Sequence, residues 1–268
     1  MIGTAPDVAK LLALAVAVTE SAGCTARTMR VVGVSGVSTK TTSTDVVTAA
    51  DRAVEAQAIA ELRAARPGDA ILGEESGSSG AGAVRWILDP IDGTVNYLYG
   101  LPNYAVSLAA ELDGVVVAGV VHQPATGHTW TATRGGGAWR DGERLGGSPV
   151  TELGQALVGT GFGYDPARRA HQAGVLAQVL PRVRDIRRLG AAALDLCLAA
   201  EGRLDAYYER GLAPWDHAAG ALIAAEAGLT VSGLGGAAAG PAMVVAAPPV
   251  LYQPLELLLR QLGADTGP

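Results

Sequence analysis

Cysteine is scarce in this 268-residue chain, and its placement excludes two classes of small scaffold. Cys24 and Cys197 lie far apart and form no C-x-x-C motif, so they build neither a disulfide framework nor a zinc ribbon. Basic residues are also in deficit: 20 Lys and Arg against 26 Asp and Glu give a formal net charge of −6. This balance argues against a protein whose main role is to bind nucleic-acid backbones or anionic membranes. We therefore expect a reduced, cytoplasmic protein with no direct nucleic-acid or membrane partner.

The sequence has no clear secretory signal or membrane span. Residues 11–18 are apolar, but no positive cluster precedes them, and Lys10 and Glu20 bracket the run. Elsewhere, no uncharged apolar run of about 18 or more residues has helical character. We therefore predict that residues 11–18 belong to an amphipathic first helix.

Composition and patterning predict a two-part globular chain. Apolar residues make up 49% of the sequence and charged residues 17%, which excludes intrinsic disorder. A second helix is expected at 44–65, and an antiparallel meander of short strands follows it. Strands and helices alternate from about residue 151, so we predict an α+β half at 1–150 and an α/β half at 151–268. The expected strands are 70–73, 85–88, 105–112, 115–122 and 129–133 in the first half and 156–159, 185–187, 205–208, 229–232 and 243–246 in the second, with helices at 167–180, 191–200, 216–227 and 249–262.

Acidic residues gather where predicted strands of the first half end. Glu74 follows one strand, Asp89 ends the next, and Asp92 lies in the turn after it. Because neighbouring strand ends converge, we expect these three side chains in one small volume. Two carboxylates about 4 Å apart repel by about 1 kcal/mol in water and about 4 kcal/mol at intermediate dielectric. Such a cluster must protonate or bind cations, and oxygen ligands favour a hard ion, Mg²⁺ first.

The turn D-P-I-D-G-T at 89–94 adds a feature suited to anions. Pro90 fixes the turn, Gly93 lets a ligand approach the backbone, and a short helix can begin at Thr94. Free amide groups at a helix start hold phosphate well. Metal-binding carboxylates beside such a cradle indicate phosphoryl chemistry, and an ordinary Asp-capped turn is the alternative.

Two further stretches place acidic residues at predicted helix starts. Asp216 lies in W-D-H at 215–217 and is explained, taken alone, as an N-cap. Asp51 lies near the start of the second helix, where capping and solvation suffice as an explanation. Lys40 is one of only two lysines against 18 arginines, which favours a position that needs a compact ammonium group.

Three other patterns have simpler explanations than chemistry. The glycine-rich stretch 159–163 hints at a dinucleotide loop, but it lacks the usual third glycine and an immediate helix. The arginines between 182 and 188 form a basic patch, which we interpret as a solvated face or subunit contact, with Arg188 able to approach a substrate pocket. His217 is expected on the helix surface or behind the site rather than as a catalytic base.

Taken together, these motifs resemble those of the inositol monophosphatase family. The resemblance runs from about residue 40 to 228 and rests on G-E-E-S at 73–76, W-I-L-D-P-I-D-G-T at 86–94 and W-D-H-A-A-G at 215–220. It implies an α/β fold, a layered α/β/α/β/α sandwich of the inositol monophosphatase/fructose bisphosphatase type, with the site between the two halves. It also implies a homodimer and inhibition by lithium.

The resemblance implies a site for two or three Mg²⁺ ions. Glu74, Asp89 and the Ile91 carbonyl would hold the first ion, and Glu74 would help a third through water. Asp89, Asp92 and Asp216 would hold the second. Asp92 and Asp216 would also meet the substrate.

The same resemblance assigns the residues around the phosphate. Gly93 and Thr94 would donate backbone amides to it. Asp51 and Thr94 would orient the attacking water, with Glu74 taking part in catalysis and Lys40 balancing charge. The residues expected to face the hydroxyl groups of the substrate are Gly190, Ala191, Ala192 and Glu209.

The activity implied is hydrolysis of a small phosphate ester by metal-activated water. The expected substrate is myo-inositol 1-phosphate or a similar polyol phosphate, which would yield inositol and phosphate. The sequence shows no Ser or Cys nucleophile with a base partner, so no covalent intermediate is required. The alternatives are the same chemistry on fructose 1,6-bisphosphate or 3′-phosphoadenosine 5′-phosphate, or a non-catalytic partnership with the transcription machinery.

Overall fold

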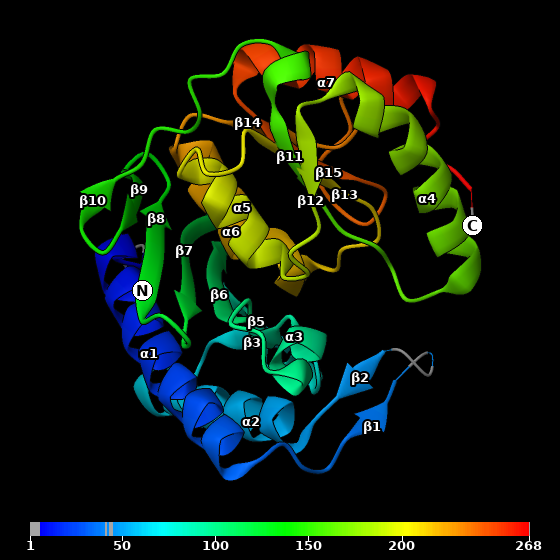
Figure 1. Cartoon of the computed structure of the whole chain (residues 1–268). Coiled ribbons are helices and arrows are strands. Elements are labelled where there is room, and N and C mark those ends of the chain that lie inside the picture. The colour runs from blue at the N-terminus through cyan, green and yellow to red at the C-terminus, as the bar shows by residue number, and fades with distance from the viewer. Residues whose placement is uncertain (1–5, 41, 43–44, 268) are drawn as a thin grey trace.

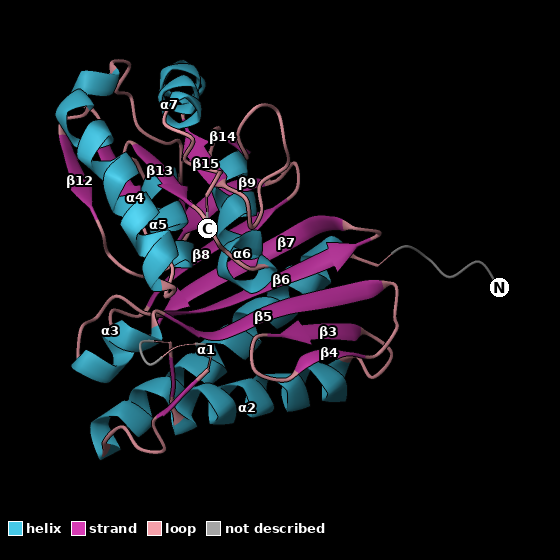
Figure 2. Ribbon diagram, turned by 90° about the vertical axis from the view of Figure 1, so that its right-hand side faces the viewer, coloured by secondary structure: helices cyan, strands magenta, loops and turns pink. Residues whose placement is uncertain are grey.

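The computed structural model describes residues 6–40, 42 and 45–267, and it stacks helices and sheets in five alternating layers (Figures 1 and 2). Helices α1 (Val8–Val32) and α2 (Ala49–Ala65) form the first layer, and an eight-stranded sheet lies on them. Helices α5 (Ala192–Ala200) and α6 (Pro214–Glu226) form the middle layer. A five-stranded sheet and then α4 (Pro166–Val179) and α7 (Pro249–Gln261) complete the stack. The predicted α/β/α/β/α sandwich is confirmed.

The eight-stranded sheet is only partly the predicted meander. From β5 to β10 every neighbouring pair is antiparallel, but β3 and β5 are parallel. The prediction missed the short strand β4, which runs back along β3, so that β5 starts from the same end as β3. The strands are β3 (Ala70–Gly73), β4 (Gly77–Ser79), β5 (Val84–Asp92), β6 (Ala105–Leu112), β7 (Val115–Gln123), β8 (His128–Thr133), β9 (Gly137–Arg140) and β10 (Glu143–Arg144).

The five-stranded sheet agrees with the sequence prediction to within one or two residues at each strand end. Strand β11 pairs in parallel with both β12 and β13, whereas β15 is antiparallel to its two neighbours. The strands are β11 (Leu157–Thr160), β12 (Asp185–Arg187), β13 (Ala206–Glu209), β14 (Thr230–Ser232) and β15 (Val244–Ala247), and one-turn 3-10 helices lie at Leu153–Gln155 and Leu180–Arg182.

Helix α2 begins later than predicted. The expected start at residue 44 lies outside the described residues, but Val46–Val47 form strand β2, which pairs with β1 (Ser38–Thr39). Thr48 is the N-cap: its hydroxyl accepts the N–H of Ala50, and Asp51 accepts the N–H of Thr48 at 2.8 Å. This reciprocal cap fixes the first turn of the helix and so ends the preceding strand.

Among the described residues, α1 is the one helix whose length and composition would allow it to cross a membrane. It packs on α2, β6 and β7 through a buried stripe spaced at three and four residues. That stripe includes Leu11, Ala15, Val18 and Ala22. The predicted amphipathic first helix is therefore confirmed.

The central core joins the two halves of the chain. One buried cluster contains Ile87 and Val121 from the first sheet, Leu196 and Ile223 from the middle helices, and Tyr207 from the second sheet. The division into domains at 1–150 and 151–268 stays a prediction, because the two sheets share this core.

Candidate active site

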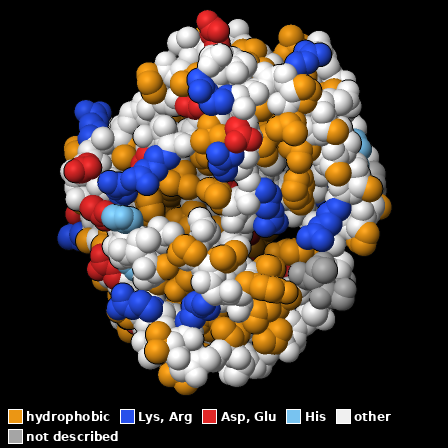
Figure 3. Space-filling model, in the orientation of Figure 1, with side chains coloured by type: hydrophobic (Ala, Val, Ile, Leu, Met, Phe, Trp, Pro, Cys, Tyr) orange, Lys and Arg blue, Asp and Glu red, His pale blue; other side chains and the backbone are white. Residues whose placement is uncertain are grey.

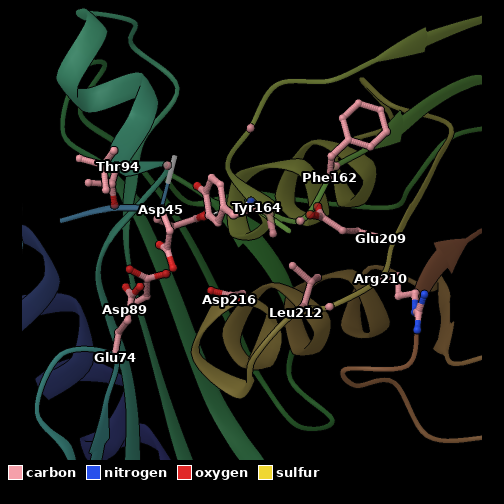
Figure 4. Close-up of a pocket in the computed structure, with 18 of the residues that line it drawn as sticks. Asp45, Glu74, Asp89, Thr94, Phe162, Tyr164, Glu209, Arg210, Leu212 and Asp216 are labelled. Carbon is pink, nitrogen blue, oxygen red and sulfur yellow. Dashed lines mark hydrogen bonds between the residues drawn. The ribbon is translucent and has the colours of Figure 1, made fainter. Parts of the chain in front are cut away.

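A cavity of about 430 Å³ opens between the two sheets, and it is visible as a hollow in the face shown in Figure 3. Its walls come from the end of β5, the loop after β11, the end of β13 and the first turn of α6 (Figure 4). It is lined by Asp45, Val46, Glu74, Asp89, Ile91, Asp92, Gly93, Thr94, Gly161, Phe162, Gly163, Tyr164, Asp165, Arg168, Arg188, Gly190, Ala192, Glu209, Arg210, Gly211, Leu212 and Asp216.

The parallel pairing of β3 and β5 brings two predicted metal ligands together. Gly73 is opposite Leu88 in the register, so the next residues, Glu74 and Asp89, lie at the same place on the sheet. The N–H of Glu74 donates to the Leu88 carbonyl at 3.2 Å, which fixes its backbone beside Asp89. Asp89 is only 2% exposed. Burial raises the pKa of Asp89 well above its ordinary value, and the charges of Glu74, Asp92 and Asp216 raise it further.

Gly93 turns the chain from β5 into the short helix α3 (Thr94–Tyr99). Its φ of +88° lies in the left-handed region that favours glycine, and a Cβ there would lie 2.7 Å from the Asn103 carbonyl oxygen. The turn places the Thr94 hydroxyl 3.0 Å from Asp51 Oδ1 and 3.1 Å from the Ile91 carbonyl oxygen. Asp51 and Thr94, predicted as a pair, are therefore in direct contact.

Asp92 ends β5 and holds the start of α5. Its two carboxylate oxygens accept the N–H groups of Ala192 at 3.1 Å and Ala193 at 2.8 Å. Burial raises the pKa of Asp92 from the ordinary 3.8 to about 7; the Ala193 N–H opposes this shift, and the charge of Glu209 adds to it. One carboxylate thus links the first sheet to the middle layer.

Asp216 and Glu209 enter the cavity from the second half. Asp216 lies in the first turn of α6, where its Oδ2 accepts the Ala213 N–H at 2.7 Å. Burial raises its pKa well above the ordinary value, and the charge of Asp92 contributes to the shift. Glu209 accepts the hydroxyl of Tyr207, and Gly161 is required beside it because a Cβ there would lie 1.9 Å from Glu209 Oε2.

Lys40 supplies a positive charge next to the acidic cluster. Its Nζ lies 2.7 Å from Glu74 Oε1, and it also donates to the carboxylate of Glu75. Burial lowers the pKa of Lys40, but the charges of Glu74 and Glu75 outweigh this effect and raise it above its ordinary value. Lys40 therefore stays protonated at neutral pH.

The donor set fits a hard cation. Among the described residues, no three His, Cys, Asp or Glu side chains already stand as a closed metal cage. The carboxylates of Glu74, Asp89, Asp92 and Asp216 nevertheless line one cavity, and each of the three aspartates is destabilised in its charged form by burial and by its neighbours. A bound cation would remove that penalty, and a ligand set made only of oxygen suits Mg²⁺.

The structure gathers most of the predicted site residues at the cavity. Ten of them line it: Glu74, Asp89, Ile91, Asp92, Gly93, Thr94, Gly190, Ala192, Glu209 and Asp216. Lys40 and Asp51 do not line the cavity but contact two residues that do, Glu74 and Thr94 respectively. Ala191 is 1% exposed and occupies the N-cap position of α5. His217 lines a different surface pocket, as expected of a residue outside the chemistry.

Sequence reasoning missed one whole wall of the cavity. Phe162 and Tyr164 follow β11, and Arg168 lies in the first turn of α4. The glycine-rich stretch 159–163 was the available signal, since Gly161 makes room for Glu209. Arg188, which was expected to be able to approach a substrate pocket, lies in the cavity wall.

Comparisons with known proteins agree with this architecture. A model of the inositol monophosphatase family matches residues 7–264. An inositol-1-monophosphatase of Mycobacterium leprae is 49% identical over 243 residues, which cover 86% of this chain and 84% of that protein. A protein of Salmonella typhimurium named Nus factor SuhB is 41% identical over 194 residues, or 71% of this chain and 72% of that one.

A solved structure extends the agreement to three dimensions. Mycobacterium tuberculosis SuhB superposes with a TM-score of 0.81 at 41% identity, over 97% of this chain and 99% of that one. Sequence and fold therefore give the same assignment over nearly the whole length. The chain belongs to the inositol monophosphatase family and is a phosphatase.

Proposed function

We propose that this chain is a Mg²⁺-dependent phosphatase that hydrolyses myo-inositol 1-phosphate or a similar small polyol phosphate. The observation that carries the proposal is the convergence of four carboxylates, from three separate segments, on one cavity beside the turn at Gly93. Glu74, Asp89, the Ile91 carbonyl, Asp92 and Asp216 would hold two or three ions. Bound Mg²⁺ would stabilise negative charge on the phosphate and on the leaving alkoxide.

The residues of the chain would position the attacking water. The Thr94 hydroxyl donates to Asp51 Oδ1, which leaves the Thr94 oxygen able to accept a hydrogen bond from water. Asp51 Oδ2 is held by the N–H and hydroxyl of Thr48 at 2.8 and 2.6 Å, so the pair is rigid. Glu74 would hold the same water from the opposite side, and Lys40 would keep Glu74 oriented. Such preorganisation is what slow phosphate-ester hydrolysis requires.

The alcohol part of the substrate would lie against the second half of the chain. Glu209 would accept hydrogen bonds from its hydroxyl groups, and Gly190 and Ala192 would supply a close backbone surface. Ala191 is buried and carries no hydroxyl, so it contributes only backbone. A small polyol fits this combination of a carboxylate acceptor and small wall residues.

Phosphate release tests the proposal. The substrates are myo-inositol 1-phosphate, fructose 1,6-bisphosphate and 3′-phosphoadenosine 5′-phosphate, each with Mg²⁺ and with EDTA. We expect Mg²⁺-dependent hydrolysis of all accepted esters and the highest kcat/KM for the inositol ester. Dominant turnover of the nucleotide would overturn the substrate assignment, and hydrolysis that persists in EDTA would overturn the metal dependence.

A second function is favoured by the Salmonella relative named Nus factor SuhB. In this alternative, the chain acts as a partner of the transcription machinery, and its surface rather than its hydrolytic site carries the role. An Asp92→Asn variant that is inactive yet supports normal growth of its host would favour this binding role. We further propose that the protein is a cytoplasmic homodimer inhibited by lithium, which sedimentation and an assay with lithium chloride would test.

A further inference from the structure

Glu55 is a buried carboxylate near the site that has no role in the proposed hydrolysis. It follows Asp51 by one turn of α2, so the two side chains lie on the same face of that helix. Both are buried, Asp51 at 0% and Glu55 at 2% exposed. Helix α2 lies beneath β3 and β4 (Figure 2). Asp51 contacts Thr94, which leaves open what the second carboxylate of this face holds.

The carboxylate of Glu55 holds two consecutive amides in the turn between β3 and β4. Its Oε2 accepts the N–H of Glu75 at 2.9 Å, and its Oε1 accepts the N–H of Ser76 at 2.7 Å. The preceding amide, that of Glu74, donates to the Leu88 carbonyl of β5. Three successive amides are therefore fixed, one by the sheet and two by Glu55.

Gly73 makes room for this contact at the end of β3. It pairs with Gly77 across the hairpin, so the turn consists of residues 74–76 alone. A Cβ at Gly73 would lie 2.8 Å from both Cδ and Oε2 of Glu55. The glycine thus lets the carboxylate approach the strand end directly before Glu74.

The chemistry of the contact requires a carboxylate. Both partners are N–H donors, and an ionised carboxylate accepts through each of its oxygens. A glutamine would offer one oxygen and one NH₂ group, so one donor would face another donor. Burial makes this mismatch costly, because neither group can turn to water instead.

The turn that Glu55 fixes carries Glu74, one of the proposed metal ligands. The side chain of Glu74 is held by Lys40 at 2.7 Å, but its backbone depends on the neighbouring amides. Metal affinity is sensitive to groups that orient a ligand without touching the metal, and their loss commonly weakens binding 10- to 100-fold. Glu55 stands in that relation to Glu74.

We propose that Glu55 is a positioning residue for the metal centre: its carboxylate fixes the turn 74–76 and so holds Glu74 beside Asp89. This inference rests on the proposed function, because it takes Glu74 as a metal ligand. It gives the two buried carboxylates of α2 parallel tasks. Asp51 positions Thr94, and Glu55 positions Glu74.

Calorimetric titration of Mn²⁺ into the whole chain tests this role without a substrate. We expect Glu55→Gln to weaken the tightest binding step by about tenfold. Glu61→Gln is the matched control, because Glu61 lies on the same helix and its Oε1 alone accepts Ser21 Oγ and Gln57 Nε2, each at 2.9 Å. That variant removes the same charge and should bind Mn²⁺ like wild type. Unchanged affinity in Glu55→Gln, or equal losses in both variants, would overturn the role.

A double-mutant cycle separates positioning from a general loss of stability. Gly73→Ala should displace the Glu55 carboxylate and raise the Mg²⁺ concentration for half-maximal activity about tenfold, with kcat at saturating Mg²⁺ within about threefold of wild type. Glu55→Ala frees that space, so adding Gly73→Ala to it should change the Mg²⁺ requirement by less than about twofold. Losses that simply add would overturn the inference.

The Mn²⁺ titration also separates this inference from the proposed function. Weaker binding by Glu55→Gln in a chain that hydrolyses no ester would support the positioning role and overturn the function. Wild-type binding by Glu55→Gln in an enzyme that hydrolyses the inositol ester would overturn the positioning role alone.

Discussion

The charge of Asp89 is unfavourable because the side chain is buried and faces three other carboxylates. We predict that Asp89→Asn lowers kcat for phosphate release at saturating Mg²⁺ by about a hundredfold or more. The same change removes a repelled charge, so the metal-free variant should unfold at higher urea concentration than metal-free wild type. Malachite-green assays and urea titrations in EDTA check the two effects. A variant with the Mg²⁺ dependence of wild type would contradict the assignment of Asp89 as a ligand.

Asp92 makes the metal-free protein sensitive to pH. Its folded pKa of about 7 exceeds the ordinary 3.8, so the folded state keeps a proton that the unfolded chain releases between pH 4 and 7. The contribution of this group to stability is therefore complete below pH 4 and is lost as pH rises toward 7. We predict that, in EDTA, wild type loses stability relative to Asp92→Asn between pH 5 and 7, by at most about 1.4 kcal/mol per pH unit. Urea unfolding at pH 5, 6, 7 and 8 measures the difference, and a difference that does not change with pH would refute the shift.

At the scale of elements, the N-cap of α2 couples folding to catalysis. Thr48 donates to Asp51, and Asp51 contacts Thr94. We predict that Thr48→Ala destabilises the fold by about 1 kcal/mol and also lowers kcat, because Asp51 loses one of its donors. Urea unfolding and phosphate release on the same preparation measure both.

The first helix offers a matched control for this cap. Asp7 caps α1 by accepting the Ala9 N–H at 3.0 Å, far along the chain from the cavity-lining residues. Asp7→Ala should lower stability by a similar amount and leave kcat unchanged. Equal kcat losses in the two variants would show that Thr48 acts only through stability.

The prediction of helices and strands succeeded where the apolar periodicity was strong. It failed where pairing between strands determines the structure. Helices α4 to α7 and strands of the second sheet were placed to within one or two residues, because apolar spacing and Gly or Pro stops are local signals. The start of α2 was misplaced because Val46 and Val47 are excluded from the helix by pairing with Ser38 and Thr39. The short edge strand β4 was also missed, because its three residues carry no periodicity and only its pairing with β3 defines it.

At the scale of the whole molecule, close packing between the first sheet and the middle layer sets the site. Gly119 in β7 lies against α6, and a Cβ there would lie 3.0 Å from Ala219 Cα. We predict that Gly119→Ala destabilises the protein by about 1–3 kcal/mol and weakens Mg²⁺ binding, because Asp216 on α6 moves away from Asp89. Urea unfolding and the Mg²⁺ concentration for half-maximal activity measure these effects.

Gly174 in α4 is the comparison for Gly119. It is exposed, and a Cβ there meets nothing within 4 Å. Gly174→Ala should therefore stabilise the helix by up to about 1 kcal/mol and leave the Mg²⁺ requirement unchanged. If Gly119→Ala lost stability but kept its Mg²⁺ requirement, the spacing of the layers would not control the site.

The acidic cluster of the site and the approach of Arg188 could be predicted from the sequence, whereas the position of Arg168 could not. Glu74, Asp89 and Asp92 lie within a short stretch of strand ends, and their grouping was predicted, but the parallel pairing of β3 and β5 that produces it was not. Arg168 and Arg188 reach the cavity from separate elements, and nothing local indicates that loops 161–165 and 210–212 face the same space. Their place depends on the packing of the second sheet over the first.

The two oxygens of Asp51 have different tasks: Oδ2 closes the cap of α2, and Oδ1 meets Thr94. This division has a consequence for laboratory evolution. A library screened only for heat resistance would keep this aspartate, because losing it removes half of the reciprocal cap of α2, and so would retain one group of the site that was never screened. Asp216 also has two tasks, because one of its oxygens accepts the Ala213 N–H and the side chain is a proposed metal ligand. Thermal selection of this chain should therefore retain Asp51, whereas it would not retain Asp89, whose loss relieves charge repulsion in the metal-free protein.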